Sequence, residues 1–116
     1  MRSGTVLLTD APVDNQGKGE YFSPTDLVAT ALGTCILTTV GIACMRENFS
    51  IDDTTAAITK IMADNPRRIG EIIVELSFPP NDYTDSQKEL IESTARGCPV
   101  ARSLHPDVKQ TMVFKY

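Results

Sequence analysis

The fold is decided by an uncharged stretch, LVATALGTCILTTVGIACM, which runs from Leu27 to Met45. This stretch is long enough to cross a bilayer as a helix. Eleven of its nineteen residues, however, are Ala, Gly, Thr or Cys, which makes membrane insertion marginal, and the rest of the chain is polar. We therefore expect a soluble protein with one helix buried on nearly all sides, and no membrane partner.

Small residues along this helix point to a close neighbour. Ala29, Gly33 and Gly41 would let another backbone approach the helix closely. In a domain this small, the covering surface can come from a second copy of the chain. The sequence therefore predicts a homodimer.

The start of the helix is marked by Ser23-Pro24-Thr25-Asp26. Ser23 can accept a hydrogen bond from the amide of Asp26, and the carboxylate of Asp26 can reach back to complete a capping box. Pro24 is at the first helical position, where a missing N–H is tolerated. These residues predict that the helix begins here.

The flanking segments complete an α+β pattern. Residues 5–9 (TVLLT) are rich in β-branched and apolar residues and predict a strand, and 54–62 with 69–78 predict a β-hairpin around the turn 64–68. Thr84 and Gln87 predict a second capped helix that ends at Gly97, and Cys98-Pro99 predicts a short helix with Cys98 as N-cap. Residues 108–116 alternate as a last strand. The order β-α-β-β-α-β, with the second helix split, predicts one α+β domain over residues 1–116.

Composition and charge exclude several classes of protein. The chain has 116 residues, 41% of them apolar, which suits one globular domain. Its net charge is −4 and its basic residues are scattered, so nucleic acid is not expected as a partner. An odd number of cysteines, three, argues against a secreted disulfide scaffold and for the cytoplasm. The single histidine, His105, excludes motifs that bind a metal through two imidazoles.

Cysteines are the candidates for chemistry, and their positions differ. Cys98, at a helix start, should ionise more easily than an isolated thiol because free amides and the helix dipole stabilise its thiolate. Cys35, in the middle of the long helix, needs a cation from elsewhere in the chain, and the spacing does not identify which one. A cysteine in an Ala/Thr/Leu helix is also a common apolar filler, and we interpret Cys44 in this way. His105, beside Pro106, is interpreted as a helix-end or surface residue.

Three motifs carry a resemblance to a known family. They are Phe22-Ser23-Pro24-Thr25-Asp26-Leu27-Val28-Ala29 continuing to Ala31-Leu32-Gly33-Thr34-Cys35, then Asn65-Pro66-Arg67-Arg68-Ile69-Gly70, and Cys98-Pro99-Val100-Ala101-Arg102-Ser103-Leu104-His105-Pro106. In these motifs the sequence closely resembles the OsmC/Ohr family, the osmotically inducible protein C and organic hydroperoxide resistance proteins. The likeness covers nearly the whole chain.

The resemblance implies an OsmC-like fold, with an antiparallel sheet, a long buried central helix and an intertwined homodimer whose two active sites lie at the subunit interface. It implies a thiol peroxidase that reduces organic hydroperoxides and hydrogen peroxide. Cys35 would be the peroxidatic cysteine and Cys98 the resolving one, joined in a disulfide during turnover. A dithiol reductant, with lipoylated proteins as the expected donors, would restore both thiols. No metal, haem or flavin is implied.

Two further positions bear on this expectation. Family members place an arginine on an N-terminal loop against the peroxidatic sulfur, and Arg2-Ser3-Gly4-Thr5-Val6 resembles that segment, which makes Arg2 the candidate for stabilising the thiolate and steering the peroxide. Better-studied branches carry a glutamate directly after the helix-start proline, whereas this chain has Thr25 there, followed by Asp26.

Two alternatives remain open from the sequence. An OsmC-like dimer could act as a redox sensor or a small-ligand binder that forms the disulfide without efficient turnover. A non-catalytic ferredoxin-like binding module has the same element order, and it predicts that Cys35 and Cys98 lie far apart.

Overall fold

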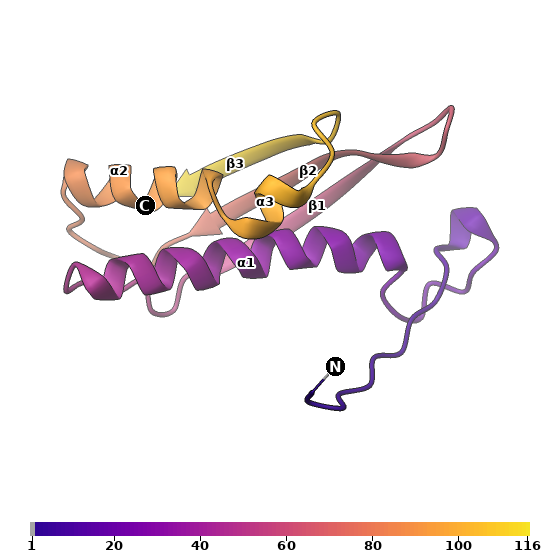
Figure 1. The fold of residues 1–116 in the computed structure, drawn as a ribbon, viewed down its shortest axis with the longest axis horizontal. Helices are drawn as coiled ribbons and strands as arrows, with labels where there is room; N and C mark the ends of the chain where they lie inside the picture. The colour runs from indigo at the N-terminus through magenta and orange to yellow at the C-terminus, as the bar shows by residue number, and fades with distance from the viewer. Residues whose placement is uncertain (1) are drawn as a thin grey trace.

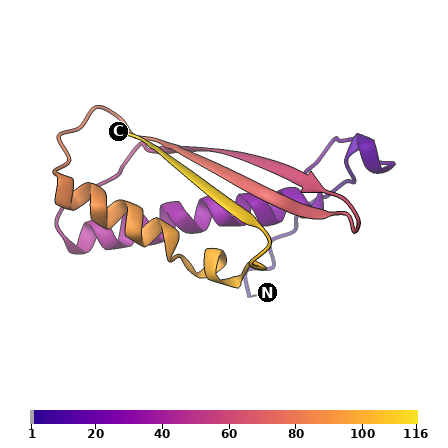
Figure 2. The ribbon, with the colours of Figure 1, turned by 90° about the horizontal axis from the view of Figure 1, so that it is seen from above.

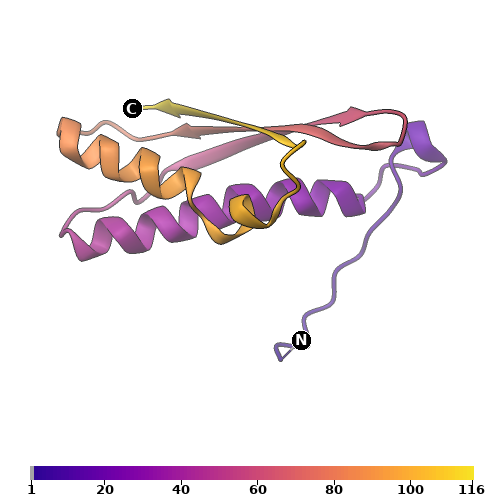
Figure 3. The ribbon, with the colours of Figure 1, turned by 45° about the horizontal axis from the view of Figure 1, so that its top comes forward.

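A three-stranded sheet forms one layer of the protein and three helices form the other (Figures 1 and 3). The computed structural model describes residues 2–116. The sheet contains β1 (Thr55–Ala63), β2 (Arg68–Ser77) and β3 (Lys109–Lys115), in the order β1-β2-β3. The helices are α1 (Pro24–Arg46), α2 (Asp85–Arg96) and α3 (Pro99–Ser103), and a short 3-10 helix, η1 (Val13–Asn15), precedes them. The predicted α+β class with a split second helix is confirmed.

Helix α1 begins where the sequence predicts. Ser23 Oγ accepts a hydrogen bond from the Asp26 amide at 3.1 Å, and Asp26 Oδ2 accepts one from the Ser23 amide at 2.9 Å. The helix ends beyond the uncharged stretch, at Arg46, whose positive charge suits the negative end of the helix dipole. Thr84 and Gln87 form the same reciprocal box at the start of α2.

The sheet is mixed, which corrects the expectation of a wholly antiparallel one. Strands β1 and β2 form the predicted hairpin, pairing Thr55 with Ser77, with a register shift between Ile61 and Met62. Strand β3 pairs with β2 in parallel, from Glu71 opposite Lys109. The reason is that α2 and α3 carry the chain back along the sheet before β3 begins, as parallel strands require (Figure 2).

One side of α1 provides the centre of the hydrophobic core. The alternating inward residues of β2 and the apolar stripe of α2 pack against it. The fully buried members with the largest side chains are Leu32, Ile36, Val40, Ile72, Val74, Leu76 and Ile91. Gly33 allows β1 to come close, because a Cβ there would lie 2.8 Å from Ile58 Cγ1 and closer still to Ile58 Cδ1.

The other side of α1 is uncovered in the single chain, so the helix is not buried on nearly all sides as expected. Between the two helix ends, Pro24 and Arg46, its exposed residues carry no charge, and they are Val28, Ala31, Thr34, Thr38, Ile42 and Met45. By length and composition α1 could cross a membrane, with a mean hydropathy of 2.0 over its most apolar part. Its packing against the sheet and α2 instead makes it the core helix of a soluble fold.

The strand predicted over residues 5–9 is not formed in the single chain. This segment is extended and leads away from the helices and the sheet (Figures 1 and 3). A strand requires a hydrogen-bonded neighbour, and no strand of residues 2–116 pairs with this segment. Its apolar side chains are therefore exposed, with Val6 82%, Leu7 65% and Leu8 66% accessible.

Candidate active site

Cys98 caps the short helix α3, as the sequence predicts. Its Sγ accepts a hydrogen bond from the Ala101 amide at 3.4 Å, and Pro99 occupies the first helical position. Two side chains hold this turn in place: Arg102 Nε donates to the Gly97 carbonyl at 2.9 Å, and Gln110 Nε2, from β3, donates to the Ala101 carbonyl at 2.9 Å. The Cys98 sulfur therefore has a fixed position.

Burial raises the pKa of the Cys98 thiol above its usual value. The hydrogen bond from the Ala101 amide acts in the opposite direction, as expected for a helix start. The neighbouring side chain of Cys35 raises the pKa further. The expectation that Cys98 ionises more easily than an isolated thiol is therefore wrong, because the residue is 1% exposed and desolvation outweighs the amide.

Cys35 lies on α1 against this turn, so the fold brings together two thiols that are distant in the sequence. Cys35 is half-buried and reachable from solvent, whereas Cys98 is enclosed. This contact contradicts the ferredoxin-like alternative, which predicts that the two cysteines lie far apart. Two neighbouring thiols of this kind are the arrangement from which a disulfide forms in proteins once one sulfur is oxidised.

Cys44 is separate from the thiol pair. It is fully buried in the core, and burial raises its pKa. The interpretation of Cys44 as an apolar filler agrees with this environment.

A half-buried cation lies at the start of α1. Lys60 Nζ is 2.8 Å from Asp26 Oδ1, and it donates to Thr25 Oγ1 at 2.8 Å and Ser23 Oγ at 3.3 Å. Its side chain is only 15% exposed. The hydrogen bond from Lys60 and the one from the Ser23 backbone hold the pKa of Asp26 below its ordinary value. Both carboxylate oxygens of Asp26 are thereby engaged within the helix start.

Lys60 was not among the predicted site residues, although the sequence contains a signal for it. Lys60 follows Ala56 and Ile58 at the inward positions of β1, where an alternating strand places core residues. A lysine at such a position needs an anionic or polar partner, and the helix start supplies one.

The comparison with protein families agrees with this architecture. The family described as OsmC-like protein matches residues 17–112. The chain belongs to the OsmC-like family. A search of the curated proteins found no match.

Solved structures of similar proteins cover almost all of this OsmC-like chain. A Psychrobacter arcticus protein, provisionally named an osmotic stress induced and detoxification response protein, is 46% identical, with a TM-score of 0.92 over 98% of this chain and 82% of its own. The Legionella pneumophila organic hydroperoxide resistance protein OsmC has a TM-score of 0.80 at 14% identity, over 98% and 85%. Bacillus subtilis OhrB has a TM-score of 0.66 at 18% identity, over 90% and 76%. The latter two show the shared fold.

Arg2 is not brought to the thiol pair in the single OsmC-like chain. It is exposed in the N-terminal segment, which leads away from α1, and it has no hydrogen bond or ion pair within residues 2–116 (Figure 1). Its role stays a prediction. His105 is exposed after α3, as interpreted, and its Nδ1 accepts a hydrogen bond from the Asp107 amide at 3.1 Å.

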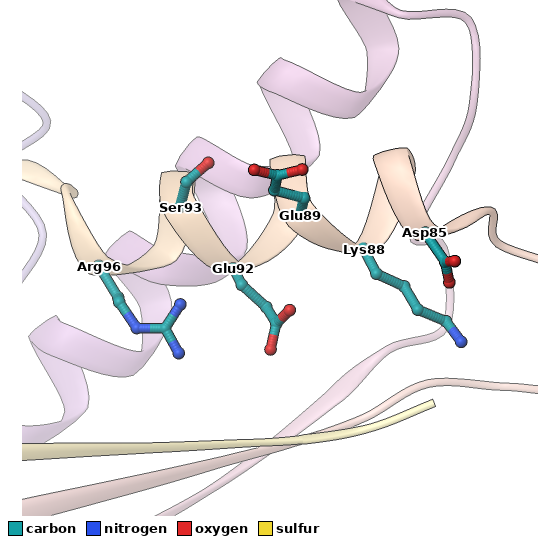
Figure 4. A pocket seen from close by; sticks show the side chains of 6 residues that line it. All are labelled: Asp85, Lys88, Glu89, Glu92, Ser93 and Arg96. Atoms are coloured by element: carbon teal, nitrogen blue, oxygen red, sulfur yellow. The ribbon is translucent and has the colours of Figure 1, made fainter.

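Within residues 2–116 no cluster of His, Cys, Asp and Glu could hold a metal ion. A pocket on α2 is lined by Asp85, Lys88, Glu89, Glu92, Ser93 and Arg96, all from this one helix (Figure 4). Both cysteines of the thiol pair lie outside this pocket, which we interpret as a solvated charged face.

Proposed function

We propose that the chain is a thiol peroxidase that reduces organic hydroperoxides and hydrogen peroxide in the cytoplasm. Membership of the OsmC-like family supports a redox or peroxide-related role. The two-cysteine peroxidase mechanism is supported by the proximity of a half-buried thiol, Cys35, to a buried thiol, Cys98. The accessible sulfur meets the peroxide, and the enclosed sulfur is held ready for the second step.

The reaction follows from this arrangement. The Cys35 thiolate attacks a peroxide oxygen, the O–O bond breaks, and the alkoxide leaves and takes up a proton to become the alcohol. Cys35 is then a sulfenic acid. Cys98 attacks its sulfur, an S–S bond forms, and the hydroxyl leaves with a proton as water. Two electrons pass from the thiols to the peroxide, and no cofactor takes part.

The raised pKa of Cys98 suits the resolving role. A thiol that stays protonated does not compete with Cys35 for the peroxide, and it gives up its proton only in the resolving step, where the leaving sulfenic hydroxyl takes that proton to become water. Cys35 packs against the buried cluster that contains Cys98 and acts on the pKa of its thiol, which supports a short path between the two sulfur atoms. The sulfenic acid can therefore be captured without a large rearrangement.

A homodimer is part of this proposal. The uncharged face of α1, which includes Ile42 at 47% and Met45 at 72% exposure, is uncovered in the single chain. The extended N-terminal segment also exposes three consecutive apolar side chains, Val6, Leu7 and Leu8. Contiguous exposed apolar surface of this kind is typical of an interface. A second copy could cover both surfaces and could bring Arg2 to a thiol pair.

Peroxide chemistry is tested on the reduced protein with one equivalent of cumene hydroperoxide, followed by thiol counts and intact mass. We expect rapid loss of two thiols and a Cys35–Cys98 disulfide, which the Cys35→Ser variant cannot form. Cys98→Ser should accumulate a sulfenic acid at Cys35, while Cys44→Ser, the matched control, should behave as the parent. Thiols that stay reduced in folded protein would contradict the proposal.

The reductant, the dimer and Arg2 are tested separately. Dihydrolipoamide, as a dithiol, should sustain turnover better than the monothiol glutathione. Sedimentation should give a dimer for the parent and a shift toward monomer for Ile42→Glu. Arg2→Ala should slow the reaction of Cys35 with peroxide, whereas Lys18→Ala, on the same segment, should not.

A second candidate function is favoured by one observation. Thr25 carries no charge and Asp26 is fully engaged with Ser23 and Lys60, so neither supplies a free carboxylate at the helix start. An OsmC-like redox sensor, which forms the disulfide once and turns over slowly, fits this feature. Multiple turnovers with excess peroxide and dihydrolipoamide support the peroxidase, and a single rapid oxidation followed by slow turnover supports the sensor.

A further inference from the structure

A pocket of about 650 Å³ lies where the β1–β2 turn, the α3–β3 connection and the first turn of α1 meet. We call it the hairpin pocket. Its volume lies within the range typical of small-molecule sites, roughly 300–1,000 Å³. Pro66, Ile69 and Val108 provide its apolar wall. Thr25, at the helix start, also lines it, whereas neither Cys35 nor Cys98 does.

Two groups in the hairpin pocket offer hydrogen-bond donors. Arg68 Nη1 donates to the carbonyls of Asp64 at 2.7 Å and Pro66 at 2.8 Å, which fixes the plane of the guanidinium group. Its Nε and Nη2 groups have no partner among residues 2–116. A guanidinium group held in this way presents a fork that matches a carboxylate.

The imidazole of His105 adds a second donor. Its Nδ1 accepts the Asp107 amide hydrogen, so the neutral ring carries its proton on Nε2. That N–H has no partner within the described chain. Arg68 and His105 line the same cavity from two different segments, the β2 start and the α3–β3 connection.

One carboxylate restricts what can bind. Asp107 also lines the hairpin pocket, and its Oδ2 is 3.7 Å from His105 Nδ1. The negative charge of Asp107 offsets the positive charge of Arg68. A ligand with several negative charges would therefore bind no more tightly than a ligand with one. A ligand with one carboxylate and an apolar body suits both the polar donors and the apolar wall.

We propose that the hairpin pocket binds a small amphipathic monocarboxylate, with its head at Arg68 and His105 and its body against Pro66, Ile69 and Val108. This site does not depend on the peroxidase proposal, because no thiol takes part in binding. Binding should therefore be unchanged in the Cys35→Ser variant.

The test is a titration of the reduced, isotope-labelled full chain with octanoate, followed by amide chemical shifts. We expect saturable shifts confined to residues 65–69 and 105–108, and no comparable shifts with 1-octanol, which lacks the carboxylate. Arg68→Gln should weaken binding about tenfold or more, since it removes a charged hydrogen-bond donor. Arg67→Gln is the matched control, because Arg67 faces Asp14 at 3.5 Å and does not line the pocket.

Arg68→Gln also removes two hydrogen bonds within the β1–β2 turn. A second variant therefore tests the pocket while leaving these hydrogen bonds in place. Val108→Asp places a carboxylate in the apolar wall without removing the Arg68 hydrogen bonds, and it should also abolish octanoate binding. The proposal would be overturned if octanoate caused no saturable shifts in the full chain, which is the result expected if the N-terminal segment of a second copy fills the pocket. Shifts centred on α1 would also overturn it. So would equal binding of 1-octanol, or equal weakening of octanoate binding by Arg67→Gln.

Discussion

Replacing Ser23 by alanine tests whether the start of α1 depends on more than helix capping. Ser23 is 1% exposed, and its Oγ accepts the Asp26 amide hydrogen at 3.1 Å. The same oxygen also accepts a hydrogen bond from Lys60 Nζ at 3.3 Å. Thr84 provides a matched control, because it forms the same capping box at the start of α2 but is exposed, and within residues 2–116 no lysine donates to its hydroxyl.

The magnitude follows from the hydrogen bonds that each substitution removes. Removing an N-cap hydroxyl costs about 1 kcal/mol of unfolding free energy, and we expect Thr84→Ala to show this cost alone. Ser23→Ala also removes one of the three oxygen partners of the Lys60 ammonium group. A hydrogen bond to a charged group contributes about 1.5–3 kcal/mol; because two partners remain, we expect about 1 kcal/mol more, and about 2 kcal/mol in total.

Urea unfolding at one fixed protein concentration measures both variants. With a slope of about 1.5 kcal/mol per molar urea, Ser23→Ala should lower the midpoint by about 1.3 M and Thr84→Ala by about 0.7 M. In a Lys60→Met background the cost of Ser23→Ala should fall to that of Thr84→Ala. Equal destabilisation by the two single variants, or an undiminished cost in the Lys60→Met background, would refute the assigned role of Lys60.

Three further predictions concern acid stability, thiol access and helix packing. The pKa of Asp26 is lowered in the folded state, so its stabilising effect is present above the unfolded pKa and is lost as the pH falls through the folded pKa. Between pH 6 and pH 2, the urea midpoint of Asp26→Asn should therefore fall less steeply than that of the parent protein. In native protein a thiol reagent should modify one cysteine rapidly, and Cys35→Ser should abolish this phase, since Cys44 is fully buried; a second rapid thiol would contradict the burial pattern. Gly33→Ala should destabilise the protein by about 1 kcal/mol despite the gain in helix propensity, because the new Cβ would collide with Ile58. Adding Ile58→Val should recover part of the stability, measured by thermal unfolding. No recovery would rule out this contact as the cause.

Local signals in the sequence were sufficient for the helix starts and the hairpin. Ser23 with Asp26, Thr84 with Gln87, and Cys98 with Pro99 each mark a helix start through residues no more than three positions apart, and all three are found as expected. The hairpin follows from alternation on either side of a turn. These features depend on neighbours in the sequence, so the sequence displays them directly.

Features that depend on distant residues were harder to predict. The parallel pairing of β3 with β2 results from where α2 and α3 return the chain, and no local pattern encodes it. The lowered accessibility of Cys98 outweighs the helix-start effect that its position suggests, because the core packs around it. The segment over residues 5–9 has the composition of a strand but has no partner within the described chain, so its state depends on what lies beside it.

The sulfur atom of Cys98 has two roles, one in capping α3 and one in the proposed redox chemistry. Sγ of Cys98 terminates the backbone of α3 by accepting the Ala101 amide hydrogen, and it is also the atom that would bond to Cys35. A serine at this position can still cap the helix but cannot form a disulfide, whereas an alanine can do neither. A comparison of Cys98→Ser with Cys98→Ala can thus separate the contribution of the residue to local folding from its contribution to electron transfer. Natural exchange of this cysteine for serine would be expected to leave the architecture intact while ending its redox cycle.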